Sequence, residues 1–137
     1  MAQENVELVR GAYEAFSRGD LPALLDALHP GIEWDAREAL LHKGLYVGHE
    51  GVKEYVGRMA DVWEDFQLEP QEARDVGQGL VLVQGRIEGR DKSTGQAMEA
   101  RFTHLAHIAG NKVVKLQILL DPSQALKVAN EAATESG

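Results

Sequence analysis

The segment MEARFTHLAHI, residues 98–108, decides how the rest of the sequence is interpreted. Its even positions are apolar apart from His104, whereas its odd positions are mixed and mostly polar. This alternation is typical of a β-strand with one face on a hydrophobic core, so the segment is predicted to bury His104. A buried polar group without a partner costs about 1–3 kcal/mol. We therefore expect a side chain, a backbone carbonyl, a water molecule or a ligand to hydrogen-bond to His104, and Tyr13 is the side chain that we favour.

The sequence before residue 66 is mostly helical in its periodicity, and the sequence after it has a period of two. The first part is predicted to begin with a helix that carries the apolar stripe Val6, Val9, Tyr13 and Phe16 and ends at Gly19. A second helix is capped by Asp20, has a core face of Leu21, Leu24, Leu25 and Leu28 and breaks at 29–31. A strand over 32–36, an irregular stretch over 37–48 and a helix over 49–65 follow. Those of the second part are strands over 66–76, 80–90, 98–108 and 112–120, the last with Val114, Leu116, Ile118 and Leu120 inward, then a helix capped by Asp121 and a frayed tail over 133–137. Long irregular stretches such as 37–48 often form the lid or mouth of a pocket.

This order predicts a single α+β domain over residues 1–137. Helices that lie together in the sequence, followed by a meander of strands, pack against one face of an antiparallel sheet. A curved sheet wrapped around the N-terminal helices would enclose a pocket, and apolar pockets of this kind bind small molecules.

The composition excludes several classes of protein. The chain has 137 residues, a net charge of −8 and no cysteine. A phosphate-binding surface for nucleic acid is not expected, since lysine and arginine form no cluster in the sequence. Neither a membrane span nor a signal peptide is predicted, so we expect a cytoplasmic protein. The histidines and carboxylates show no metal-ligand spacing, and we expect neither a metal nor a cofactor.

Four stretches together resemble one superfamily. They are YEAFSRGDLPALLDALHPGIEW at 13–34, YVGHEGVKEY at 46–55, TGQAMEARFTHLAHIAGNKVVKL at 94–116 and LLDPSQAL at 119–126. In this order they resemble the nuclear-transport-factor-2-like superfamily, and within it the SnoaL-like domains, which are related to polyketide cyclases and ketosteroid isomerases. The resemblance implies a cone-shaped α+β fold with a pocket. It also implies a homodimer formed through the outer face of the sheet, where Leu105, Val113 and Leu119 are predicted to point.

The resemblance to SnoaL-like cyclases extends to one histidine. Those cyclases pair a strand histidine with an aspartate on the last strand, and THLAHIAGNKV at 103–113 matches the segment around that histidine, so that His104 occupies its position. The aspartate position is occupied by Ile118, and the position of the cyclases' first-helix tyrosine falls on Phe16. His104 is therefore present without its carboxylate partner.

The resemblance to ketosteroid isomerases does not extend to their catalytic groups. Those enzymes use a carboxylate base, a tyrosine and a protonated carboxylic acid. The matching positions here hold Ala36, about Ala12 and about Thr103, with Tyr13 one residue from the tyrosine position.

Two functions follow as alternatives. The first is a small-molecule-binding SnoaL-like domain that acts as a lyase, isomerase or cyclase on an apolar or polycyclic substrate, with His104 and Tyr13 as catalytic residues. The second is a non-catalytic module that binds an apolar ligand or mediates dimerisation, since the family's catalytic carboxylate is absent. In both, the residues predicted to line the pocket are Phe16, Trp34, Tyr55, Met59, Trp63, Phe102 and Ile118.

Overall fold

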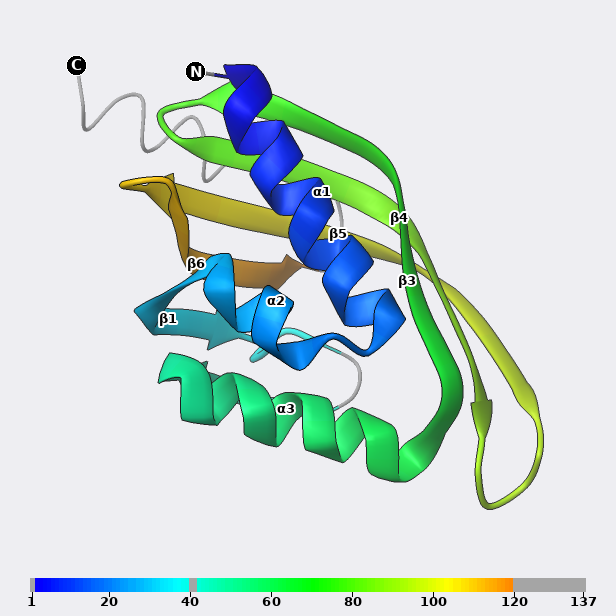
Figure 1. The fold of residues 1–137 in the computed structure, drawn as a ribbon. Coiled ribbons are helices and arrows are strands. Elements are labelled where there is room, and N and C mark those ends of the chain that lie inside the picture. Colours follow the sequence, from blue (N-terminus) through cyan, green and yellow to red (C-terminus); the bar gives the residue numbers. More distant parts are fainter. Residues whose placement is uncertain (1, 40–41, 120–137) are drawn as a thin grey trace.

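The computed structural model describes residues 2–39 and 42–119. In this part of the chain, the helices are α1 (Ala2–Arg18), α2 (Leu21–Asp26) and α3 (Gly48–Val62), and the strands are β1 (Leu28–Asp35), β2 (Leu45–Val47), β3 (Trp63–Gly77), β4 (Leu80–Asp91), β5 (Ala97–Ala109) and β6 (Lys112–Leu119). The strands form one curved sheet in the order β2-β1-β6-β5-β4-β3, and the helices lie together against its concave face (Figure 1). The predicted α+β class is confirmed. None of the described helices is long and apolar enough to cross a membrane.

The sheet is mixed, whereas the sequence predicted an antiparallel one. Strand β1 lies parallel to β6, with Trp34 beside Leu116, and every other neighbouring pair is antiparallel. A hairpin fixes the direction of the next strand through its short turn, but β1 and β6 are separated by most of the chain. Their relative direction therefore has no local signal in the sequence.

The second helix is shorter than predicted, and β1 begins earlier. Helix α2 is capped by Asp20, whose side chain accepts a hydrogen bond from the backbone N–H of Ala23, and it ends at Asp26. Leu28, predicted on the core face of that helix, is the first residue of β1 and pairs with Val113. The register of β1 against β6 shifts between Leu28 and Glu33. Pro30 lies within this irregular stretch, where its missing backbone N–H breaks no regular hydrogen bond between the strands.

The stretch 37–48 contains a strand that the sequence analysis did not predict. Strand β2 pairs with the end of β1, with Tyr46 beside Trp34. Helix α3 then passes into β3 without a loop, because Trp63 already has extended backbone angles and pairs with Asp91. The predicted helix over 49–65 is therefore too long at its C-terminal end, and Trp63 does not continue the buried stripe of Val52, Tyr55 and Met59.

Strand β6 carries a bulge that reverses part of its predicted alternation. His107 pairs with Lys115 while Ile108 pairs with Val113, so Val114 is an extra residue in the ladder. As a result Val113 joins the main core, although it was predicted to point outward, and Val114, predicted inward, is half-buried. Leu116 and Ile118 lie inward as predicted.

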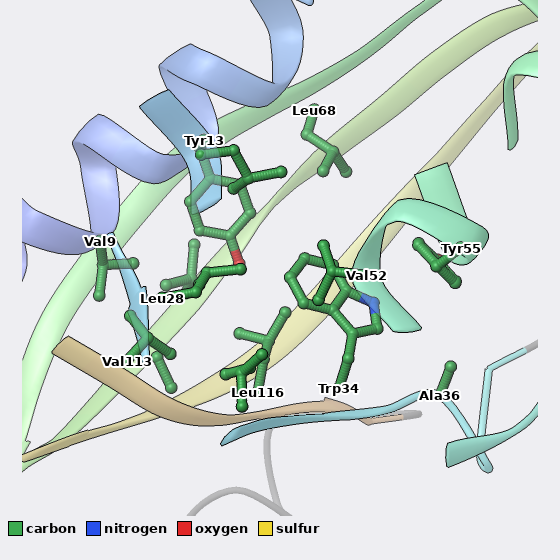
Figure 2. Close-up of a cluster of buried hydrophobic side chains, with 14 of the residues drawn as sticks. Val9, Tyr13, Leu28, Trp34, Ala36, Val52, Tyr55, Leu68, Val113 and Leu116 are labelled. Atoms are coloured by element: carbon green, nitrogen blue, oxygen red, sulfur yellow. The ribbon is translucent and has the colours of Figure 1, made fainter. Parts of the chain in front are cut away.

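The two faces of the sheet carry separate apolar clusters. The main core lies between the helices and the concave face, and Figure 2 shows side chains from α1, β1, α3 and β6 converging there. On the other face, Leu105 and Leu119 point outward as predicted and cluster with Leu80 and Leu82. The homodimer through this face stays a prediction. The predicted inward position of Leu120, the helix capped by Asp121 and the frayed tail lie outside the described residues.

Gly85 permits the close approach that shapes one wall of the interior. A Cβ atom at Gly85 would lie 2.0 Å from the backbone oxygen of Glu69 on β3 and 2.8 Å from the ring of Phe102 on β5. Only glycine, which has no Cβ atom, avoids both collisions. Gly85 pairs with Pro70, next to the point where the register of β3 against β4 shifts between Pro70 and Glu72. The Phe102 ring can therefore lie across β4 beside His104.

Candidate ligand-binding site

The predicted contact between Tyr13 and His104 is present. Tyr13 comes from the buried stripe of α1 and His104 from the inner face of β5, and Oη of Tyr13 lies 2.6 Å from Nδ1 of His104. Figure 2 shows the Tyr13 side chain reaching from α1 toward the sheet. The rings of Tyr13, His104 and Phe102 lie against one another, with centroid distances of 4.5–5.8 Å. The hydrogen bond ties the helical layer to the sheet.

Both members of this pair are electrically neutral over a wide pH range. Burial lowers the pKa of His104 to about 3, because the charged imidazolium would lose its water. Burial also raises the pKa of the Tyr13 hydroxyl well above its usual range. At neutral pH the pair is an imidazole and a phenol joined by a hydrogen bond.

The neighbours of His104 on the sheet are aliphatic. Val83 on β4 and Ile118 on β6 lie directly opposite it across the two ladders. Opposite residues in a sheet have Cβ atoms about 5 Å apart, so an aspartate at position 118 would lie beside the imidazole and stabilise its charged form. With Ile118 there, the imidazole has no such support. This agrees with the absence of the cyclase aspartate inferred from the sequence.

A cavity of about 160 Å³ touches His104. Six of the seven residues predicted to line a pocket are in its wall, namely Phe16, Trp34, Tyr55, Met59, Phe102 and Ile118. Trp63 is not among the residues that line the cavity, because it belongs to the first residues of β3 rather than to the inner stripe of α3. A second cavity of about 30 Å³ also touches His104 and has Tyr13 in its wall.

Several residues of the wall were not predicted from the sequence. They are Glu38, Ala39, Phe66, Leu68, Ile87, Met98, Ala100, Arg101, Thr103 and Leu119. The apolar ones on β3, β4 and β5 could have been found from their alternation, whereas alternation placed Leu119 on the outer face. Glu38 had no such signal, because its place at the cavity depends on how the chain turns after β1. It is the one carboxylate in the wall within the described residues.

An aromatic cluster forms the α3 side of the cavity. The ring of Tyr55 contacts those of Trp34 and Tyr46, with centroid distances of 5.5 and 5.2 Å. Burial, with a smaller effect of Tyr46, raises the pKa of Tyr55 to about 12, so its hydroxyl is neutral. The indole Nε1 of Trp34 lies near this hydroxyl and opposes the rise in pKa, but it does not reach hydrogen-bonding geometry with any described residue.

The histidines of β5 do not form a metal site. His104 and His107 lie on opposite faces of the strand, His104 against Tyr13 and His107 against Gln117. Among the described residues, no three histidine or carboxylate side chains lie close enough to hold a metal ion.

Comparison with known proteins agrees with this fold. The family model of the SnoaL-like domain matches residues 9–116. No curated protein matches the sequence.

Solved structures match over almost the whole chain. TerC, crystallised with polyporic acid, is 23% identical and has a TM-score of 0.77 over 93% of this chain and 98% of its own. An NTF2-like protein from Burkholderia thailandensis is 25% identical, with a TM-score of 0.77 over 89% and 96%. A protein from Xanthomonas campestris described as a polyketide cyclase is 19% identical, with a TM-score of 0.74 over 93% and 98%. These likenesses concern the fold.

Proposed function

Because the chain belongs to the SnoaL-like domain family, we propose that it binds a small, largely apolar organic molecule in the cavity between its helices and its sheet. The observation that carries this proposal is the cavity of about 160 Å³ that touches His104, a buried polar side chain held in place by Tyr13. Pockets for small molecules are mostly apolar, with a few fixed polar groups that orient the ligand. TerC, which has the same fold, was crystallised with polyporic acid.

The state of His104 favours binding over acid–base catalysis by this residue. A general acid or base works best when its pKa lies near the working pH. The pKa of His104 is lowered to about 3 by burial, so at neutral pH it is not protonated and its affinity for a proton is low. A neutral imidazole remains an effective hydrogen-bonding group for a ligand.

Binding can be tested with aromatic fragments of one and two rings followed by NMR. Binding in the cavity should shift the signals of Phe102, Tyr55 and Met59. The variant Ile118→Phe, which fills part of the cavity, should weaken binding by roughly tenfold. Val114→Phe is the matched control, since Val114 lies on the same strand and does not line the cavity. If no fragment shifts the lining residues, or if both variants weaken binding equally, the proposal is wrong.

One observation favours a catalytic alternative. Glu38 lines the same cavity as His104 and is a carboxylate that can accept a proton. An isomerase or lyase acting here would use Glu38 as its base and His104 to position the substrate. The test is deuterium uptake at the α-carbon of 1-indanone in D2O. Catalysed uptake that is lost in Glu38→Gln and kept in Glu33→Gln supports the alternative, and uptake no faster than in buffer excludes this chemistry for that probe.

A further inference from the structure

We propose that residues 121–133 of this chain form an amphipathic helix that packs on the outer face of the sheet, over a cluster of four leucines. This outer-face cluster consists of Leu80, Leu82, Leu105 and Leu119, with the partly buried Val76 packed against it. It lies on the other side of the sheet from the main core and the cavity.

The outer-face cluster is covered, although no described helix lies on it. Leu80, Leu82 and Leu105 are each at most 2% exposed. The members of the cluster all come from strands, and the described helices lie against the opposite, concave face (Figure 1). Side chains on a bare sheet face leave their ends in water, which is why such a face is normally polar. Burial this complete therefore requires a layer over the leucines.

The burial is already complete in a single copy of the chain. The structure contains one chain, which favours the chain itself over a second copy as the occupant of this face. Outside the described ranges lie residues 1, 40–41 and 120–137. Of these, only 120–137 is long enough to supply a layer.

The chain leaves β6 at the cluster itself. Leu119, the last residue of β6, is a member of the cluster, so the chain continues from this face. Neighbouring strands are about 5 Å apart, so β4, which carries Leu80 and Leu82, lies about 10 Å from β6. A helix over 122–133 would be about 18 Å long. It is therefore long enough to turn back over β5 and reach β4.

The sequence of the segment has the pattern of a helix that packs on one side only. Asp121 and Pro122 suit the N-cap and the first helical position. At about 100° per residue, one side of the helix carries only apolar residues and the other only polar ones. The apolar side holds Ala125, Leu126, Val128, Ala129, Ala132 and Ala133, and the polar side holds Ser123, Gln124, Lys127, Asn130 and Glu131. The alanines let the helix lie close to the larger leucines of the sheet.

A second copy of the chain is the competing occupant. The resemblance to SnoaL-like domains implies a homodimer through this same face, whereas the matched family domain ends at residue 116, before the segment begins. The two occupants differ in whether the contact with the leucines forms within one molecule or between two.

Lysine substitutions in the full chain test which side of the segment is packed. Ala129→Lys places a charge on the apolar side, and lysine is nearly as good a helix former as alanine. It should move the methyl NMR signals of Leu82 and Leu105 and raise the fluorescence of ANS, a dye that binds exposed apolar surface, several-fold. Asn130→Lys is the matched control, because it adds the same charge to the polar side, and it should change neither. Equal effects of the two variants, or no effect of Ala129→Lys, would overturn the proposal.

A spin label decides whether the contact lies within one molecule. The sequence has no cysteine, so Asn130→Cys provides a single attachment point on the polar side. In isotope-labelled protein, the spin label should broaden the methyl signals of Leu82 and Leu105 more than that of Val52, which lies in α3 on the concave side.

A mixed sample carries the isotope and the spin label on different molecules, and there the broadening should be absent. Broadening of the same leucine signals in the mixed sample would assign the face to a second copy. Absence of broadening in the first sample would show that the segment lies elsewhere. Either result overturns the proposal.

Discussion

His104 and His107 lie on the same strand, three residues apart, and each makes one hydrogen bond to an uncharged side chain. Nδ1 of His104 lies 2.6 Å from Tyr13, and Nε2 of His107 lies 2.7 Å from Oε1 of Gln117. Burial lowers the pKa of both. Because the residues of a strand alternate between its faces, however, His104 points into the core and His107 points away from it.

The two bonds connect different parts of the molecule. Gln117 is on the neighbouring strand β6, so the bond of His107 stays within the sheet and beside the charged side chains of Lys115 and Glu33. Tyr13 is on α1, so the bond of His104 joins the helical layer to the sheet, with the aliphatic side chains of Val83 and Ile118 opposite His104 and a cavity beside it. The face of the strand, more than the residue type, therefore decides whether a histidine ties the helical layer to the sheet or pairs within the sheet.

Truncation of each histidine in turn should separate the two faces of the strand most clearly. His104→Ala should lower the free energy of unfolding by about 1–3 kcal/mol, because it leaves a larger cavity and a buried tyrosine hydroxyl without a partner. His107→Ala should cost less than about 1 kcal/mol, since its surroundings are partly exposed. Urea unfolding of both variants measures the difference. Equal losses would show that the two faces do not differ in this way.

Acid should destabilise the protein through His104. Its folded pKa of about 3 lies below its ordinary value of 6.5, so the unfolded chain binds the proton more readily. The stability that comes from the neutral ring is complete above pH 6.5 and is lost as the pH falls, by about 2 kcal/mol between pH 6.5 and 5. The lowered pKa of His107 adds a change of the same sign. Unfolding measured across this range should show the slope.

The double variant Tyr13→Phe/His104→Phe is the control for this pH dependence. It removes the imidazole, so most of the slope should vanish with it. A slope as steep as that of the wild type would assign the acid sensitivity to other groups.

Removal of the tyrosine hydroxyl alone tests the tie between the layers. Tyr13→Phe should cost about 1 kcal/mol, because it takes the hydrogen bond from Nδ1 of His104 but leaves the ring packing in place. Together with His104→Phe it completes a double-mutant cycle, and the double variant should lose clearly less than the sum of the single ones. Additive losses would mean that the contact contributes no coupling energy.

The smallest effect is expected on the outer face. Gln117→Leu should change the free energy of unfolding by no more than about 0.5 kcal/mol. The bond to Gln117 raises the pKa of His107 against the effect of burial, so its removal should lower that pKa further. NMR titration of His107 measures the shift, and His104 should be unaffected. A rise in the pKa of His107 would contradict the assigned contact.

The parts of the site that depend on local periodicity can be predicted from the sequence. The alternation in 98–108 placed His104 and Phe102 inward, and the helical stripe of residues 6–16 placed Tyr13 toward the same core. Burial of one polar group in each was enough to predict that they meet, because each has few other partners. The capped start of α2 at Asp20 was readable for the same reason, since a helix cap involves only neighbouring residues.

How the strands pair and where the segments between them lie could not be predicted from local patterns. The parallel pairing of β1 with β6 joins segments far apart in the chain. The bulge that turns Val113 into the core is a matter of the register of β6 against β5, and the passage from α3 to β3 that takes Trp63 out of the cavity wall goes with the pairing of Trp63 with Asp91. The presence of Glu38 at the cavity depends on how the chain turns after β1. A residue's periodicity reports which side of its own element is apolar, whereas register and direction are set by the neighbouring strand, and the sequence of one strand does not contain that information.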